Sequence, residues 1–179
     1  PVSLALGAEA TFVARAMESD RAELTTILKA AAQHRGTALV EIYQNCPIFN
    51  DGAFDALKGR DTAEDAIIPL VHGEPIRFGA NRAKGLIRDA ATGGVKVAEV
   101  AEVGEEAVLI HDAACPGPTT AFAISRLTDA GYLHQAPIGI FRQVERPAYD
   151  DQARAQVATA QALANGDRAQ RLGELIGGG

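Results

Sequence analysis

The sequence predicts an α/β fold organised around a parallel sheet. A helical pattern over residues 20–36 leads directly into a strand-like run at 37–43, and a second helical pattern over 119–131 precedes another such run at 137–144. Helix, short connection and buried strand form the repeating unit of a parallel α/β sheet. The order recurs at both ends of the chain, so both ends are expected to contribute to α/β structure.

The first 45 residues alternate helical and strand patterns. Small and apolar residues recur at helical spacing over 3–18 and predict a first helix. Asp20, with Glu23 three residues later, has the spacing of a capping box, and Gly36 is a typical helix end. The segment TALVEIY (37–43) then supplies the β-branched and aromatic residues that strands favour.

The remaining elements are predicted from shorter patterns. Residues 52–65 are polar and favour a short helical turn, and HGEPIRFG (72–79) has the Gly and Pro spacing of ordered turns. Helices are expected at 119–131, ended by Gly131, and at 150–164. Candidate strands lie at 66–71, 86–88, 95–100, 107–111 and 137–144.

Composition excludes several classes of protein. The chain has 179 residues, 47% of them hydrophobic and 22% charged, with a net charge of −6 and a pI near 5.2. An acidic surface does not favour nucleic acid or an anionic membrane as the main partner. No apolar run approaches the ~18 residues of a membrane span, and no signal-peptide pattern is present. The two cysteines cannot build a disulfide framework, so we expect a cytoplasmic protein.

The familiar nucleotide and hydrolase motifs are missing from the sequence. It contains no G-x-G-x-x-G, Walker loop, H-E-x-x-H, G-x-S-x-G or Cys-x-x-Cys pattern. A nucleotide-binding or hydrolase interpretation therefore has no support from short motifs.

The stretch EIYQNCPIFND (41–51) delivers Cys46 to the end of the predicted strand at 37–43. The carboxyl ends of parallel strands are where ligands collect in such sheets. A thiolate there is a nucleophile or a soft-metal ligand, whereas a structural cysteine behaves as a small buried hydrophobic residue. Cys115 lies in a proline-rich loop and is interpreted as an incidental thiol. A pair of Cys46 with Cys115 requires the fold to bring them together.

Other candidate residues have roles that the sequence leaves open. His72 lies in a predicted turn, and His111 ends a predicted strand beside Asp112, as a base and its orienting carboxylate would. Arg142 flanks a strand end, where it is either a clamp for an acid or a surface charge. For each of these residues the structural interpretation is the commoner one.

Three segments resemble the beta subunit of 2-oxoacid:ferredoxin oxidoreductases, especially the 2-oxoglutarate type. They are PVSLALGAEATFVARA with HRGTALVEIYQNCPIFNDGAFD, then HGEPIRFGAN, then PIGIFRQVERPAYDD, which together span residues 1 to 155 approximately. The cysteine segment and the last segment are specific in combination.

The resemblance implies a set of cofactors and partners. The family's beta subunit carries thiamine diphosphate with Mg²⁺ and one 4Fe-4S cluster, and it works with an alpha subunit. The complex decarboxylates a 2-oxoacid oxidatively onto coenzyme A and passes electrons to ferredoxin. Cys46 matches the fourth cysteine ligand of the cluster, and Pro47 and Phe49 are expected to fix and shield its loop.

The resemblance also implies that much of the subunit lies outside this sequence. The family's other cluster cysteines and its Gly-Asp-Gly…Asn motif are not found here. We therefore expect the C-terminal half of a subunit: the C-terminal part of a thiamine-diphosphate-binding parallel-sheet domain at 1–51, a C-terminal α/β extension at 52–165 and a flexible tail at 166–179. Alone, such a piece is expected to be inactive and to bind no thiamine diphosphate. The alternative is a non-enzymatic α/β interaction module in which Cys46 is a buried structural residue.

Overall fold

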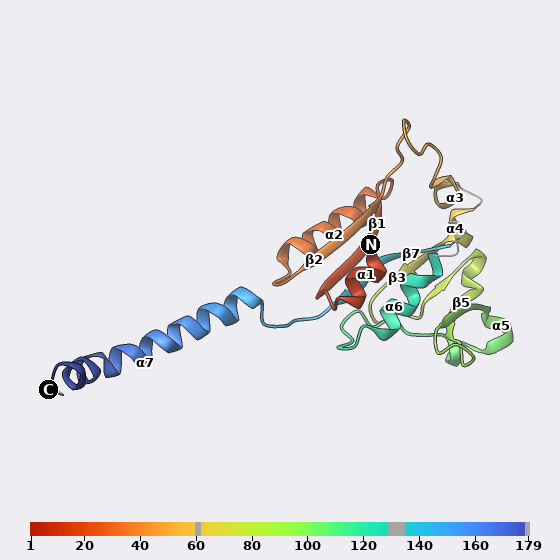
Figure 1. Ribbon diagram of the computed structural model, residues 1–179. Coiled ribbons are helices and arrows are strands. Elements are labelled where there is room, and N and C mark those ends of the chain that lie inside the picture. Colours follow the sequence, from red (N-terminus) through yellow and green to blue (C-terminus); the bar gives the residue numbers. More distant parts are fainter. Residues whose placement is uncertain (60–61, 129–134, 178–179) are drawn as a thin grey trace. The chain divides into compact units, whose positions relative to one another are not determined.

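Two sheets with helices around them make up the unit of residues 1–145, and residues 146–179 form a second unit (Figure 1). The computed structural model describes residues 1–59, 62–128 and 135–177, with side chains as far as residue 163. The elements are, in chain order, α1 (Val2–Gly7), β1 (Phe12–Met17), α2 (Arg21–Gln33), β2 (Ala38–Tyr43), α3 (Asp55–Lys58), α4 (Ala63–Ala66), β3 (Ile67–Leu70), β4 (Arg77–Phe78), η1 (Ala80–Arg82), β5 (Lys84–Arg88), β6 (Val95–Glu99), α5 (Val100–Val103), η2 (Glu105–Ala107), α6 (Thr119–Ser125), η3 (Arg126–Thr128), β7 (Ala136–Gln143) and α7 (Tyr149–Gly177).

The larger sheet has four strands in the order β2-β1-β7-β3. β1 pairs with β2 in parallel, and β3 pairs with β7 in parallel, as expected for α/β units. β7 runs antiparallel to β1, so the sheet is mixed instead of wholly parallel. The α/β fold class is confirmed, with one antiparallel pair at the centre of the sheet.

Helices cover both faces of this sheet. Ile27 of α2 packs on one face against Phe12, Ala14 and Ala16 of β1. On the opposite face, Val2 and Leu6 of α1 and Ile124 of α6 join a core that also contains Phe141 of β7. Burial on both sides explains why all six residues of β1 are buried.

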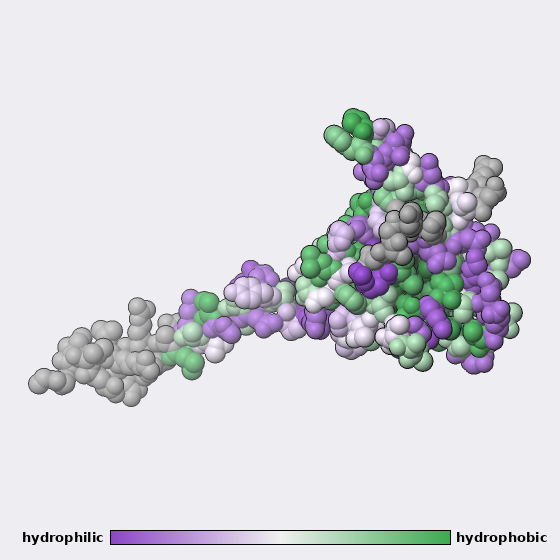
Figure 2. Space-filling model, turned by 45° about the vertical axis from the view of Figure 1, so that its right-hand side comes forward, coloured by the Kyte–Doolittle hydropathy of each residue, from purple (hydrophilic) through white to green (hydrophobic). Residues whose placement is uncertain are grey.

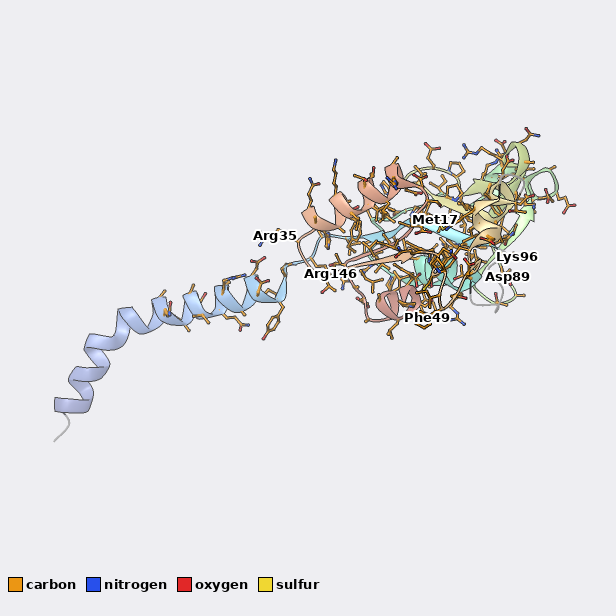
Figure 3. The ribbon with its side chains drawn as sticks, turned by 90° about the horizontal axis from the view of Figure 1, so that it is seen from above. Met17, Arg35, Phe49, Asp89, Lys96 and Arg146 are labelled. Atoms are coloured by element: carbon orange, nitrogen blue, oxygen red, sulfur yellow. The ribbon has the colours of Figure 1, made fainter. Side chains whose placement is uncertain are left out.

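The smaller sheet is antiparallel, in the order β4-β5-β6. Its residues Phe78 and Leu86 pack into the core that contains Leu6 and Phe141. Its β5–β6 turn is closed by the Asp89 carboxylate, which accepts a hydrogen bond from the Thr92 hydroxyl at 2.7 Å. Asp89 also lies 3.7 Å from the ammonium of Lys96 across the hairpin, and both are labelled in Figure 3.

The helix predicted over 3–18 is wrong beyond its first two turns. α1 ends at Gly7, and Glu9 adopts a left-handed φ of 58° before β1 begins at Phe12. Because β1 is buried on both faces, its sequence lacks the alternation that reveals a half-buried strand. The charged Arg15 in the middle of β1 further obscures the pattern of a buried strand.

The Asp20 cap and the strand after it were predicted correctly. The Asp20 side chain accepts a hydrogen bond from the Glu23 N–H at 3.0 Å, and α2 ends at Gln33, slightly before Gly36. The strand expected at 37–43 is β2.

The strand predicted at 107–111 is wrong as a continuous strand. Its residues make isolated bridges, Val108 with Ile87 and Ile110 with Pro75. The segment divides its hydrogen bonds between two partners, since the Leu109 N–H donates to Leu86 and the Leu109 carbonyl accepts from Ile76. Its extended conformation was predicted, but a ladder with one neighbour does not form.

The chain forms two compact units, and residue 51 lies within the first of them. Strands on both sides of residue 51 share one sheet, and the compact units are Pro1–Glu145 and Arg146–Gly179. The predicted boundary at residue 51 separates two domains of a complete subunit, and it stays a prediction. α7 continues to Gly177, through most of the expected tail at 166–179. The predicted helix end at Gly131 lies outside the described residues.

The packing at Gly139 generates a first prediction. Gly139 of β7 has φ +125°, pairs with both Arg15 and Leu70, and a Cβ there would lie 2.6 Å from the Leu70 carbonyl oxygen. Gly139→Ala should therefore lower the free energy of unfolding by about 3 kcal/mol, since backbone must move. Urea denaturation measures the change.

Gly117→Ala is the matched control, because nothing lies within 4 Å of a Cβ at Gly117. It should leave the unfolding midpoint within the range of ordinary surface substitutions. Equal midpoints for Gly139→Ala and Gly117→Ala would show that the sheet tolerates a side chain at Gly139.

Candidate functional site

The carboxyl ends of β1 and β2 bring the candidate site together. The parallel register pairs Met17 with Tyr43, so both strands end at the same edge of the sheet. Glu18 follows β1 directly, and the loop with Cys46 follows β2. The predicted position of Cys46 beyond a strand's carboxyl end is confirmed.

The Cys46 loop is closed by its own hydrogen bonds. Cys46 and Asn50 form an isolated bridge, in which the Asn50 N–H donates to the Cys46 carbonyl at 2.9 Å. The Asn45 amide oxygen accepts from the Gly52 N–H at 3.0 Å, and its NH₂ donates to the Asp51 carboxylate at 2.8 Å. The segment from Asn45 to Gly52 is therefore a hydrogen-bonded loop of fixed shape.

The backbone amides that follow Cys46 affect the ionisation of its thiol. The Phe49 N–H, followed by the Ile48 N–H, hydrogen-bonds the thiolate form and lowers the pKa of Cys46 below its usual value of 9.0, with a smaller effect from Asn50. The thiol is half-buried and free. These amides favour the deprotonated sulfur, which is the form that acts as nucleophile and metal ligand.

The tip of the loop is apolar and exposed. Ile48 and Phe49 are 83% and 89% exposed, and the loop after β2 projects away from the sheet (Figure 1). Hydrophobic side chains gather at the end of this projection in Figure 2, and Phe49 is labelled in Figure 3. Phe49 therefore does not shield the loop within this chain, contrary to expectation, because no described core residue covers it.

The sequence did not predict that Glu18 contributes to the candidate site. Its Oε1 accepts the Asn45 backbone N–H at 3.0 Å and the Lys58 ammonium of α3 at 2.6 Å. The Lys58 hydrogen bond, with a smaller contribution from the Asn45 N–H, lowers the pKa of Glu18 below 4.5. A position directly after a strand can signal such a role, but the helical pattern over 3–18 conceals β1.

A buried ion pair lies between the strands that support the loop. Arg15 of β1, 3% exposed, donates from Nε to the Glu41 carboxylate of β2 at 2.6 Å and from Nη1 to the Pro137 carbonyl at 3.2 Å. Its guanidinium lies 4.9 Å from the Tyr43 ring centre, and Tyr43 stacks on Phe54 at 4.6 Å. Aromatic and charged groups thus pack beneath both ends of the loop.

Cys46 has no second metal ligand of its own kind nearby in the described structure. Within residues 1–59, 62–128 and 135–177, no three His, Cys, Asp or Glu side chains are grouped so that they could hold a metal ion. Cys115 is also a free thiol, and it lines a different feature, a cavity of about 210 Å³. A metal at Cys46 would need ligands from elsewhere.

His111 and Asp112 do not form a catalytic pair. His111 is 3% exposed, and its Nε2 lies 2.7 Å from the Ile140 carbonyl oxygen. The Asp112 carboxylate accepts instead from the Ala114 N–H. His72 Nδ1 accepts from the Ala113 N–H at 3.1 Å, which requires an unprotonated nitrogen, so its 3.6 Å approach to Asp112 is not an ion pair in that tautomer. His72 thus fixes the turn after His111, and His111 attaches this segment to β7.

Arg142 is neither a surface charge nor a clamp for an acid. It is 1% exposed, and its guanidinium donates to three backbone carbonyls at distances of 2.7 to 3.0 Å. The acceptors belong to Glu9, Ala10 and Pro116. Arg142 therefore fixes the turn between α1 and β1 against the segment before α6, a structural role that the sequence did not predict.

The sequence is similar to beta subunits of oxidoreductases. No model of a known protein family matches the chain. Over 160 residues it is 55% identical to the 2-oxoglutarate oxidoreductase subunit KorB of Mycobacterium tuberculosis, covering 89% of this chain and 42% of the relative. Over 51 residues it is 41% identical to a 2-oxoacid:ferredoxin oxidoreductase subunit beta from Sulfolobus sp, covering 28% of this chain and 17% of that protein. The resemblance to these beta subunits is confirmed.

A solved structure agrees on the fold. A 2-oxoglutarate:ferredoxin oxidoreductase from Magnetococcus marinus, solved with 2-oxoglutarate, coenzyme A and succinyl-CoA bound, superposes with a TM-score of 0.54 at 20% identity. The match covers 90% of this chain and 39% of the other. The chain thus spans about two fifths of the length of both proteins, and in the described part no helix is both long and apolar enough to cross a membrane.

The burial of His111 generates a prediction about pH. Burial lowers the pKa of His111 below 6.5, partly offset by the hydrogen bond to Ile140. The stabilising contribution of neutral His111 is therefore fully present above the unfolded pKa and is lost as the pH falls through the folded pKa. In the wild type, this lowers the free energy of unfolding as the pH falls from about 7.5 to about 5. The decrease should be smaller in His111→Gln, and urea denaturation at several pH values measures it. If the free energy of unfolding depends on pH equally in His111→Gln and in the wild type, His111 does not couple folding to pH.

Proposed function

We propose that this chain is part of the beta subunit of an enzyme that oxidatively decarboxylates a 2-oxoacid with coenzyme A and passes electrons to ferredoxin. The observation that supports it best is the hydrogen-bonded loop at the carboxyl end of β2, which carries the free, half-buried Cys46 thiol. This loop lies within the region of similarity to KorB, which covers most of the chain. Cys46 is the residue we assign to the iron–sulfur cluster.

The surroundings of Cys46 fit a cluster ligand. Iron–sulfur clusters are held by thiolates, and hydrogen bonds to sulfur tune their reduction potentials. The Phe49 and Ile48 amides favour the thiolate, and the half-buried sulfur is accessible to an incoming metal. A bound 4Fe-4S cluster would accept and release single electrons. Ile48 and Phe49 would contribute apolar surface near such a ligand.

Thiamine diphosphate and Mg²⁺ fit this chain less well. The resemblance assigns their binding to a Gly-Asp-Gly…Asn motif, and the sequence contains no Gly-Asp-Gly. We assign no residue of this chain to that cofactor. In the proposed subunit, other segments bind it, and the sheet described here supports them.

The choice of substrate and partners is proposed from the relatives. KorB is named for 2-oxoglutarate, and the Magnetococcus marinus enzyme was solved with 2-oxoglutarate and coenzyme A. We therefore propose 2-oxoglutarate as the 2-oxoacid, an alpha subunit and ferredoxin as protein partners, and the cytoplasm as the location.

The edge of the larger sheet is consistent with a part of a larger subunit. β2 is its outermost strand, and no described strand pairs with its outer side. Ile42 of β2 and Leu28 of α2 are 41% and 43% exposed beside this edge. Unpaired edges and exposed apolar side chains favour association with further structure. A non-enzymatic interaction module would share this feature, so the cluster itself is the discriminating test.

The assignment of Cys46 generates a prediction for the full-length subunit. Cys46→Ser should abolish the brown colour, the bound iron and the electron transfer to ferredoxin, because a thiolate ligand is lost. Iron analysis, the visible spectrum and an assay with ferredoxin measure the three properties.

Cys115→Ser is the matched control and should retain all three properties, since Cys115 lines a separate cavity with His111 and Arg142. A Cys46→Ser subunit that keeps the full iron content of the wild type would refute the assignment and favour the interaction module.

A further inference from the structure

The loop after β2 ends in Asp51 and Gly52, which form the one Asp-Gly pair in the sequence. Glycine has no Cβ, so no side chain hinders the approach of its nitrogen to a neighbouring group. The Gly52 nitrogen can therefore attack the side-chain carboxyl carbon of Asp51 and close a five-membered succinimide ring. Asp51 is exposed, so water can reach the ring once it forms. The pair is chemically suited to rearrangement to isoaspartate.

This rearrangement needs no reagent besides water. In the first step the Gly52 nitrogen forms a bond to the Asp51 Cγ, and one carboxyl oxygen leaves as water with the carboxyl proton and the amide proton. In the second step water adds to one of the two ring carbonyls and breaks its bond to nitrogen. Opening at the side-chain carbonyl restores aspartate, and opening at the main-chain carbonyl gives isoaspartate. Water is released and taken up again, and no group is oxidised or reduced.

One side chain, that of Asn45, hydrogen-bonds both reacting groups. Its Oδ1 accepts from the Gly52 N–H at 3.0 Å, and its Nδ2 donates to the Asp51 carboxylate at 2.8 Å. The N–H that must lose its proton is thus occupied, and the carboxyl group is held by a donor. Because ring closure uses this nitrogen and this carboxyl group, both hydrogen bonds have to open first.

The other hydrogen bonds of the loop do not involve the reacting groups. The Asn50 N–H donates to the Cys46 carbonyl at 2.9 Å and closes the turn that precedes Asp51. The Asp55 N–H donates to the Gly52 carbonyl at 3.1 Å and fixes the segment that follows. Among the described hydrogen bonds, those to the Asp51 carboxylate and the Gly52 N–H come from Asn45 alone.

We propose that Asp51–Gly52 is a modification site at which isoaspartate forms when the Asn45 hydrogen bonds open, and that Asn45 thereby controls its rate. Isoaspartate adds one carbon to the main chain at the end of the loop and displaces the carboxylate that Asn45 holds. The modified loop therefore loses the connection between its two ends. The proposal does not depend on the proposed function, since it uses no property of Cys46 as a ligand.

The test compares Asn45→Ala with the matched control Gln44→Ala in the full-length subunit. Asn45→Ala removes both side-chain hydrogen bonds but keeps the backbone N–H that donates to Glu18 at 3.0 Å. Gln44 is exposed, and its side chain makes no hydrogen bond within the described residues. The proteins are incubated at neutral pH and physiological temperature. Peptide mapping with electron-transfer fragmentation then measures isoaspartate, which has the same mass as aspartate but fragments differently.

Isoaspartate at Asp51 should accumulate roughly 25-fold faster in Asn45→Ala than in the wild type, because each lost hydrogen bond changes the opening equilibrium by about a factor of 5. Gln44→Ala should accumulate it at the wild-type rate. Equal rates in Asn45→Ala and the wild type would overturn the role of Asn45. An equal increase in Gln44→Ala would do the same, because the effect would then not be specific to the side chain that holds the reacting groups.

Two measurements on the wild type decide the matter even if Asn45→Ala does not fold. The wild type unfolded in guanidinium chloride should form isoaspartate at Asp51 faster than the native protein, and an unfolded chain that forms none would show that the pair is not a modification site. In the native protein, hydrogen exchange at the Gly52 amide should be at least about 5-fold slower than in the unfolded chain. An unprotected Gly52 amide would overturn the restraint by Asn45.

Discussion

The parallel pairing of β1 with β2 determines where the features of the candidate site lie. Because the two strands run in the same direction, with Met17 opposite Tyr43, their carboxyl ends meet at one edge. Glu18 leaves one strand and the Cys46 loop leaves the other at this edge. α2 connects the strands and packs through Ile27 on the face that β1 presents to it. An antiparallel partner for β1 on that side would have placed Glu18 at the opposite end of the loop's strand.

Two buried arginines stabilise this arrangement in different ways. Arg15 pairs with Glu41 directly across the β1–β2 register, so a buried charge is neutralised within the sheet. Arg142 donates to three carbonyls around the turn that precedes β1. A buried charge without such partners is strongly destabilising, and this makes each arginine specific for the observed arrangement. The sheet is thus held in register by charges as well as by its apolar cores.

The loop at this edge combines a soft donor with an apolar exterior. Amides facing a sulfur favour its charged form, and the Ile48 and Phe49 side chains point their apolar surface outward. A protein that used Cys46 only for packing would bury the sulfur and cover the loop tip. This distribution fits the ligand role proposed for Cys46 and leaves Ile48 and Phe49 exposed at the loop tip.

The sequence by itself determined the α/β class, the Asp20-capped helix, most of the strands and the position of Cys46 after a strand. These follow from local periodicity, capping and turn residues, which act over a few neighbouring positions. It did not determine β1, whose two buried faces remove the alternating pattern, or the discontinuous pairing of 107–111. Tertiary structure alone decided that Glu18 reaches Asn45 across 27 residues of chain and that Arg142 reaches Glu9 across 133. Such contacts depend on which strands become neighbours in the sheet, and that choice is made by packing and buried charge over the whole unit.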